Sequence, residues 1–200
     1  MKPLLLIIGS LLFWSCNTTH TKEEPTSTAN MIDTVKNQTT SAPISLPKKV
    51  LLAYDVQHNF SSKENKDHFK LTIYGDSIYT GTILFQIITN DKRVIYSDTF
   101  SCRDLMGDLY DTAYTLKQKE DTIKWRASTY FSEDKFTNSL IDDSDKVYFS
   151  PDDKELEDNY NEIKADKNAI GFTFTYGYEG VYSIAYSRKK KKAVFYFISD

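Results

Sequence analysis

The sequence is poor in the residues on which compact enzymes and disulfide-linked scaffolds most often depend. Its 200 residues include three histidines and two cysteines, and they contain no nucleophile-elbow, P-loop, dinucleotide-binding or zinc-protease motif. Cys16 and Cys102 are too few for a disulfide framework. Seven glycines and 40% hydrophobic residues exclude a collagen-like or wholly disordered chain. We therefore predict no catalytic residue, no metal site and no cofactor.

The chain also lacks a strong charge of either sign. Lys and Arg number 25 against 28 Asp and Glu, which gives a formal net charge of -3. Without a large positive field there is little to attract a polyphosphate backbone, so we do not expect a nucleic-acid partner. The sequence is instead rich in aromatic residues, with 14 Tyr and 12 Phe.

The first sixteen residues predict a targeting segment. Lys2 gives a positive start, residues 4–14 form an apolar run, and Ser15-Cys16 ends it. The run is about half the roughly 20 apolar residues that a membrane-crossing helix needs. We interpret residues 1–15 as a cleavable signal peptide, with ordinary secretion or an uncleaved anchor as the alternatives.

The end of this segment, Ser15-Cys16, resembles the lipobox of bacterial lipoproteins, particularly those of the Bacteroidota. The resemblance implies that Cys16 receives diacylglycerol and a further acyl chain such as palmitate, and so anchors the mature chain in a membrane. It also implies a place in the cell envelope, at the outer membrane. Lys22-Glu23-Glu24 is similar to a surface-export signal of such lipoproteins, and we leave the periplasmic and surface faces equally open.

Three segments follow from composition. After the signal peptide, residues 16–48 are rich in Thr, Ser, Asn, Pro and Lys without a periodic apolar face, which predicts a lipidated flexible tether. Residues 49–200 have the length and patterning of a single globular domain.

Four Asp-(Ser/Thr) pairs that are followed by Val, Ile or Ala resemble the O-glycosylation motif of Bacteroidota, whereas the composition predicts roughly one such site. This resemblance implies a glycoprotein. The alternative is that some of these pairs are helix caps, with Asp121-Thr122 as a helix start. The acceptor residues would be Thr34, Ser77, Thr112 and Thr122.

Period-two alternation predicts an antiparallel sheet. Phe69, Leu71 and Ile73 alternate with polar residues, and short polar turns separate the runs. We expect strands at residues 50–57, 69–74, 78–89, 93–100, 170–176, 181–187 and 193–198.

The middle of the chain has helical periodicity instead. Apolar residues share one helical face within 102–113 and again within 123–131. Ser150-Pro151 is a good cap and first turn for a third helix, which ends near Lys167. We predict an α+β fold in which one antiparallel sheet, a meander plus C-terminal hairpins, is covered by about three helices from the middle of the chain.

Candidate sites for chemistry are few. His58 and His68 flank a polar loop and would form a site with Asp67 if they converged, but two such histidines are more typical of a surface loop. The acidic run 142–145 lacks the glycine and glutamate of an EF-hand. The basic run 188–192 is typical of a solvated hairpin turn. Cys102 lies in an apolar stripe, which is typical of a buried thiol.

Tyrosines form the most suggestive group. Tyr176, Tyr178 and Tyr182 surround one glycine-containing turn, and aromatic rings with a polar tip suit both sugar stacking and protein interfaces. We predict a non-catalytic envelope lipoprotein that binds a protein or glycan partner there. The alternatives are a hydrolase acting on envelope polymers and an inhibitor or immunity-type lipoprotein.

Overall fold

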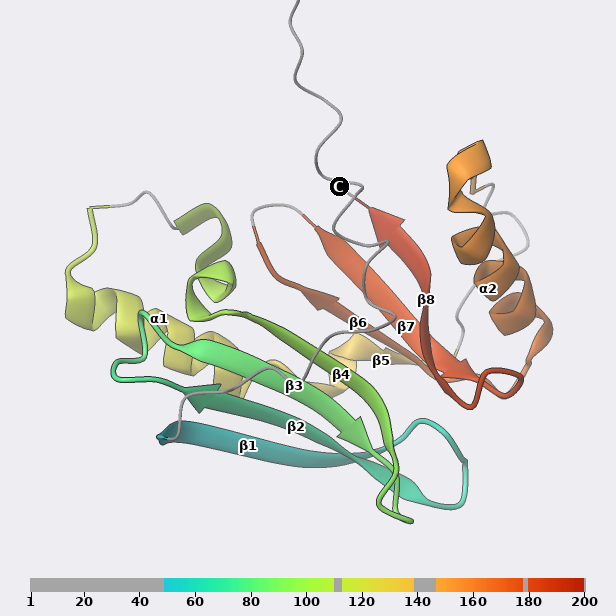
Figure 1. The fold of residues 1–200 in the computed structure, drawn as a ribbon, viewed down its shortest axis with the longest axis horizontal. Helices are drawn as coiled ribbons and strands as arrows, with labels where there is room; N and C mark the ends of the chain where they lie inside the picture. The colour runs from blue at the N-terminus through green and yellow to red at the C-terminus, as the bar shows by residue number, and fades with distance from the viewer. Residues whose placement is uncertain (1–48, 110–112, 139–146, 178–179, 200) are drawn as a thin grey trace, which may run out of the picture. The chain divides into compact units, whose positions relative to one another are not determined.

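The strands form two antiparallel sheets. The computed structural model describes residues 49–109, 113–138, 147–177 and 180–199. In Figure 1 the first sheet has the order β1-β2-β3-β4 and the second the order β5-β6-β7-β8. The strands are β1 (Val50–Asn59), β2 (Lys66–Tyr74), β3 (Thr82–Ile88), β4 (Val94–Ser101), β5 (Phe136–Thr137), β6 (Gly171–Thr175), β7 (Val181–Ser187) and β8 (Lys192–Ser199).

The first sheet is the predicted meander. Phe69, Leu71 and Ile73 of β2 are fully buried, whereas the alternate residues Lys70 and Thr72 are only half-buried. The same alternation continues in β3, which pairs with β2 without a register shift. The sheet therefore has one apolar face and one polar face, as a period of two requires.

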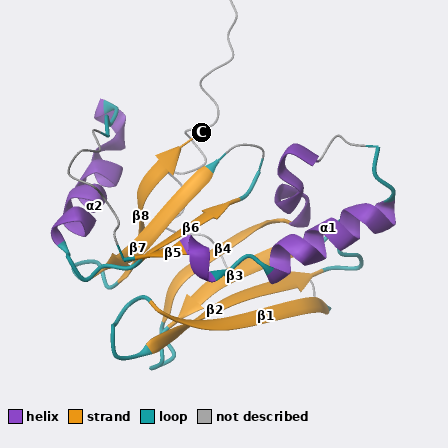
Figure 2. Ribbon diagram, turned by 180° about the vertical axis from the view of Figure 1, so that it is seen from behind, coloured by secondary structure: helices purple, strands orange, loops and turns teal. Residues whose placement is uncertain are grey.

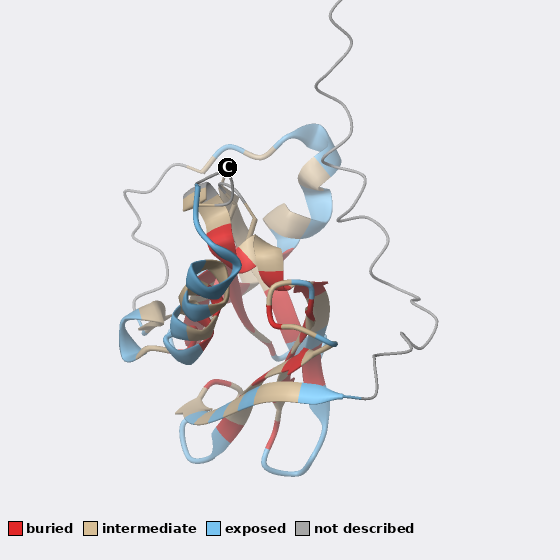
Figure 3. Ribbon diagram, turned by 90° about the vertical axis from the view of Figure 1, so that its left-hand side faces the viewer, coloured by how far each residue is buried: buried red, intermediate tan, exposed pale blue. Residues whose placement is uncertain are grey.

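The second sheet lies against the apolar face of the first, so the prediction of a single sheet is wrong. The ring centroids of Phe85 in β3 and Phe172 in β6 are 5.8 Å apart, and those of Phe85 and Phe174 are 5.6 Å apart. Buried residues gather where the two sheets face each other (Figure 3). The C-terminal hairpins therefore build a second sheet instead of extending the first.

The predicted helices exist with changed boundaries. The first is the 3-10 helix η2 (Cys102–Leu109), followed by α1 (Leu116–Ser128) and the short η3 (Glu133–Lys135). α1 begins at Leu116, not at Asp121, because Thr115 and Gln118 form a capping box that satisfies the first helical N–H groups. Ile123 and Ala127 of α1 join the core between the sheets.

The third helix is divided between η4 (Pro151–Asp153) and α2 (Lys154–Ala165). The side chain of Ser150 caps it, as predicted. Tyr160 and Ile163 pack with Ala185 and Val194 in a small second cluster, so α2 covers the face of the second sheet that is turned away from the first (Figure 2). The strands and helices together make a mostly β fold with some helix.

Cys102 is fully buried at the start of η2. Burial, with a smaller contribution from the charge of Asp104, raises the pKa of its thiol to about 12. The prediction of a buried structural thiol is confirmed.

Candidate functional site

A cleft of about 550 Å³ opens beside the C-terminal half of α1. Its walls come from η2, α1 and η3, which follow one another in the chain, and from Thr175, Gly177 and Gly180 at the distant ends of β6 and β7. Such a volume lies within the range of about 300–1,000 Å³ that is typical of small-ligand pockets. The side chains that line it include Asp104, Trp125, Arg126, Tyr130, Asp134, Lys135 and Thr175.

The walls of the cleft are joined by hydrogen bonds. Arg126 Nη1 donates to the carbonyl oxygens of Leu105 and Met106, both at 2.9 Å, which fastens α1 to η2. The Gly177 N–H donates to the carbonyl oxygen of Asp104 at 2.9 Å, which fastens the end of β6 to the same segment. Gly107 turns the chain with a φ of 54°, and a Cβ there would lie 3.0 Å from Arg126 Nη1. The cleft is therefore a preformed feature of the fold.

Trp125 forms the lip. Its side chain is 64% exposed, because it lies on the side of α1 opposite the buried Ile123 and Ala127. The same ring also lines a second hollow of about 400 Å³, with Tyr114, Gln118, Asp121 and Thr122. A large and mostly exposed aromatic ring thus lines two concave surfaces.

Tyr130 and Lys135 lie deeper. Tyr130 is only 2% exposed, and its hydroxyl has no hydrogen-bond partner among the described residues. Lys135 places Nζ 5.0 Å from the centre of the Tyr130 ring. Burial lowers the pKa of Lys135, and Asp134 opposes this only in part. No described carboxylate lies within ion-pairing distance of Lys135 Nζ.

Two carboxylates complete the cleft, and their environments differ. Burial raises the pKa of Asp104, although the Ser101 N–H donates to its Oδ2 at 3.0 Å. A hydrogen bond from the Ser132 side chain lowers the pKa of Asp134. Among the described lining residues, the negative charges of these two carboxylates equal in number the positive charges of Arg126 and Lys135.

The predicted tyrosine site is next to this cleft, but its rings serve packing. Tyr176 stacks between Phe100 and Tyr182, with both centroid distances 4.8 Å, and both tyrosines are half-buried. Tyr178 lies outside the described residues. From this turn it is Thr175, Gly177 and Gly180 that line the cleft.

A half-buried acid lies beside the tyrosine stack. Asp98 of β4 faces the second sheet and accepts hydrogen bonds from the hydroxyls of Tyr96, at 3.5 Å, and Tyr176. Burial raises the pKa of Asp98 in spite of these bonds. Burial and the nearby Asp98 charge also raise the pKa of Tyr176.

The two histidines do not converge. His58 is the cross-strand partner of Asp67, and Gln57 is that of His68, so successive side chains point to opposite faces of the sheet. His58 stacks on Phe136 and contacts Glu133 at 3.0 Å, whereas His68 bonds to Asp55 on the other face. Both oxygens of Asp67 are occupied by Ser61.

The charged runs contribute no site among the described residues. The basic run forms the β7–β8 turn, as predicted, and there Arg188 pairs with Asp166 and Lys190 with Glu155. The acidic run 142–145 lies outside the described residues. Within the described ranges, no group of three or more His, Cys, Asp or Glu side chains is placed to hold a metal ion.

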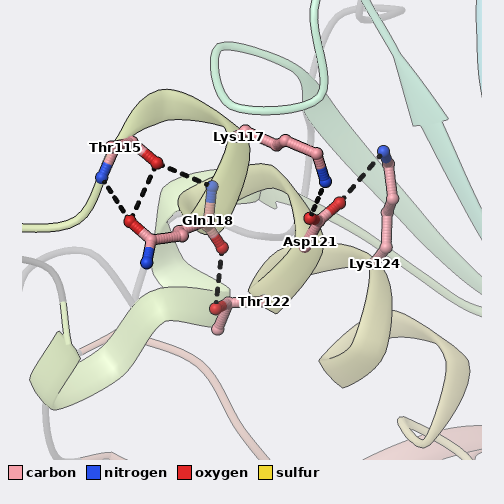
Figure 4. Close-up of polar contacts among 6 residues, drawn as sticks. All are labelled: Thr115, Lys117, Gln118, Asp121, Thr122 and Lys124. Carbon is pink, nitrogen blue, oxygen red and sulfur yellow. Dashed lines mark hydrogen bonds and ion pairs between the residues drawn. The ribbon is translucent and has the colours of Figure 1, made fainter.

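Two of the predicted glycosylation sites can be placed. Ser77 is half-buried in the β2–β3 loop, where its hydroxyl hydrogen-bonds to Thr80 at 2.8 Å. Thr122 lies within α1 and donates to the carbonyl oxygen of Gln118 at 2.9 Å (Figure 4). Thr34, Thr112 and the predicted lipid attachment site Cys16 lie outside the described residues.

The sequence analysis did not identify the cleft residues. Trp125 could have been found, because it lies off the apolar stripe of its own helix and so had to be exposed. Lys135 and Tyr130 carried no such signal. Their setting arises only when η3, α1 and the β6–β7 turn meet in the folded domain.

Comparison of the chain with protein-family models, with curated proteins and with solved structures gives no match. No helix in the described part of the chain is long and apolar enough to cross a membrane.

Proposed function

We propose that this chain is a non-catalytic envelope lipoprotein that is anchored through Cys16 and binds a ligand of the envelope in the cleft beside α1. The observation that carries the binding role is that one cleft holds both an exposed ring and a cation without an ion pair. Trp125 is 64% exposed at the lip, and no described carboxylate forms an ion pair with Lys135, whose ammonium group rests on the Tyr130 ring. Exposed aromatic surface and unpaired charge both cost stability, and a bound ligand offsets both costs.

The anchoring part rests on the sequence. The apolar run that ends at Cys16 and the polar segment after it fit a lipid-anchored domain on a tether. Metabolic labelling with an alkyne fatty acid tests it. We expect the chain to be labelled and to sediment with membranes, and Cys16→Ser to lose both properties. Labelling that persists in Cys16→Ser would overturn the anchor.

The binding part can be followed by fluorescence, because Trp14 and Trp125 are the two tryptophans of the chain. In a Trp14→Phe chain, all tryptophan emission comes from the lip of the cleft, whether or not residues 1–15 have been removed. We expect an outer-membrane extract that has been freed of protein, and so adds no tryptophan emission of its own, to change this emission in a saturable way.

A matched pair of variants separates the cleft from other surfaces. Thr175→Phe fills the cleft from an exposed position at the end of β6, and we expect it to abolish the response. Ser97→Phe adds the same ring at an exposed position of β4, outside the lining residues, and the response should persist. A response that is equal in both variants would show that the cleft is not the binding site.

One observation favours a second candidate, a hydrolase acting on envelope polymers. Asp104 and Asp134 line one cleft, and their surroundings move their pKa values in opposite directions. Such a pair is what acid–base cleavage of a glycosidic bond uses. Asp104→Asn distinguishes the two functions. A hydrolase would lose product release from outer-membrane polysaccharide, whereas the binding protein would release no product with or without the substitution.

A further inference from the structure

We infer that the ligand of the cleft is an acidic saccharide, whose sugar ring stacks on Trp125 and whose carboxylate pairs with Lys135. This inference rests on the proposed function, because it names the chemical class of the ligand. It differs from the tyrosine face predicted from the sequence in its residues and in the charge that it assigns to the ligand.

Trp125 provides a surface on which a ligand ring can stack. The indole of Trp125 projects from α1 and is open on the side of the cleft and on the side of the neighbouring hollow. A flat aromatic ring with a polar N–H at its edge suits a ligand that has an apolar face and a polar rim. A pyranose ring has this shape, with C–H groups on its faces and hydroxyls around its edge.

Hydroxyl groups around the lip suit the rim of a sugar. Thr129, Ser132 and Thr175 all line the cleft. A hydroxyl donates one hydrogen bond and accepts others, so it can pair with a sugar hydroxyl in either sense. Thr129 already donates to the carbonyl oxygen of Trp125, and Ser132 bonds to Asp134, so these two hydroxyls offer a sugar their oxygens as acceptors.

Lys135 indicates the charge of the ligand. Several other cations of the domain form ion pairs with carboxylates. Examples are Arg188 with Asp166 at 2.7 Å and Lys190 with Glu155 at 2.9 Å. Lys135 instead rests on the ring of Tyr130, partly withdrawn from water. A charge in such a place attracts an opposite charge more strongly than it would in bulk water.

The carboxylates limit how much negative charge the ligand carries. Asp104 and Asp134 line the same cleft as Lys135 and Arg126, so the described charges cancel. A single carboxylate beside Lys135 is compatible with this balance. A phosphate dianion or a polysulfated chain would be repelled by the two aspartates. A sugar acid with one carboxylate per ring therefore fits better than a phosphorylated or sulfated glycan.

The test uses the Trp14→Phe chain and three kinds of disaccharide. The first contains a hexuronic acid, the second is its methyl ester, and the third is the neutral parent sugar. We expect saturable quenching of Trp125 by the acid and about tenfold weaker binding of the ester and of the neutral sugar, since one charge-assisted hydrogen bond is lost.

Two substitutions check the assignment. Lys135→Gln should remove the preference for the acid over the ester. Lys119→Gln is the matched control, because Lys119 Nζ also lies over a tyrosine ring, 5.2 Å from the centre of Tyr79, but does not line the cleft. Lys119→Gln should keep the preference. Trp125→Phe should weaken binding of the acid when this is measured by calorimetry.

The outcomes separate this inference from the proposed function. Equal binding of acid and ester, or a preference that survives Lys135→Gln, would overturn the acidic ligand but leave the cleft as a binding site. If all three disaccharides failed to bind while outer-membrane extract still gave a response sensitive to Thr175→Phe, the saccharide class would be wrong and the binding function would stand.

Discussion

The ring of Tyr176 lies parallel to that of Tyr182, with the centroids 4.8 Å apart and the planes 8° apart. Phe100 stacks on the other side of Tyr176, also at 4.8 Å. The three rings connect the end of β4 to the start of β7 and close one edge of the space between the two sheets. These tyrosines therefore hold the sheets together beside the cleft.

Removing the middle ring should destabilise the domain. We expect Tyr176→Ala to lower the free energy of unfolding by about 2–4 kcal/mol, because it removes a large half-buried side chain and two stacking contacts. Tyr176→Phe keeps the ring and loses only the hydrogen bond to Asp98, so its cost should be about 1 kcal/mol. Chemical denaturation measures both. Tyr148→Ala is the control, since Tyr148 is 90% exposed, and equal costs for Tyr148→Ala and Tyr176→Ala would contradict the packing role.

Asp98 should make stability depend on pH. Burial raises the pKa of this carboxyl above its ordinary value of 3.8 in the folded domain. The folded state therefore holds the proton more tightly than the unfolded state does. The stability contributed by the neutral acid is fully present below pH 3.8 and is lost as the pH rises through the folded-state pKa.

Asp98→Asn isolates this contribution, because the amide does not titrate. The free energy of unfolding of the native chain should fall relative to that of Asp98→Asn as the pH rises from 3 to 7. Urea denaturation across this range gives the difference directly. A difference that stays constant with pH, or that changes in the opposite direction, would be inconsistent with a raised pKa.

The thiol of Cys102 should be inert in the folded protein. A pKa of about 12 leaves on the order of a thousandfold less thiolate at pH 8 than an ordinary cysteine has, and the side chain is fully buried. In a Cys16→Ser chain Cys102 is the remaining thiol. We expect it to react with a disulfide reagent only after denaturant is added, and prompt reaction under native conditions would disprove its burial.

The first turn of α1 should depend on its capping box. Thr115 accepts a hydrogen bond from the Gln118 N–H, while Gln118 Oε1 accepts from the Thr115 N–H at 2.9 Å (Figure 4). Thr115→Ala should therefore cost about 1 kcal/mol of stability. Lys117→Met is the control, because it removes an exposed ion pair with Asp121 in the same turn and should change little.

Local structure was largely predictable from the sequence. β7 has the predicted bounds, and Ser150 caps its helix as expected, because alternation and capping depend on neighbours in the chain. The pattern Thr115-x-x-Gln118 is that of a capping box and also indicates where α1 begins, although we predicted the helix start at Asp121. The two-residue β5 is too short for any period to appear.

The division into two sheets could not be predicted in the same way. Alternation shows that Phe85 and Phe172 each lie on an apolar face, but not whether the two faces belong to one sheet or oppose each other. The position of the cleft could not be predicted from local patterns either. The exposure of Trp125 follows from helical spacing, whereas the meeting of Lys135 and Tyr130 with Asp104 and Thr175 in one cleft depends on contacts between separate segments.

The small cluster beneath α2 has a consequence for how the domain opens. Tyr160 and Ile163 bury their side chains apart from the main aromatic core, and the helix is further fastened by Asn159, which donates to the Phe195 carbonyl oxygen at 2.9 Å. This helix can detach without exposing any ring between the sheets, so its amide protons should exchange with solvent at a lower free energy than those of β3. The domain would then come apart in two steps, and the cleft would survive the first of them.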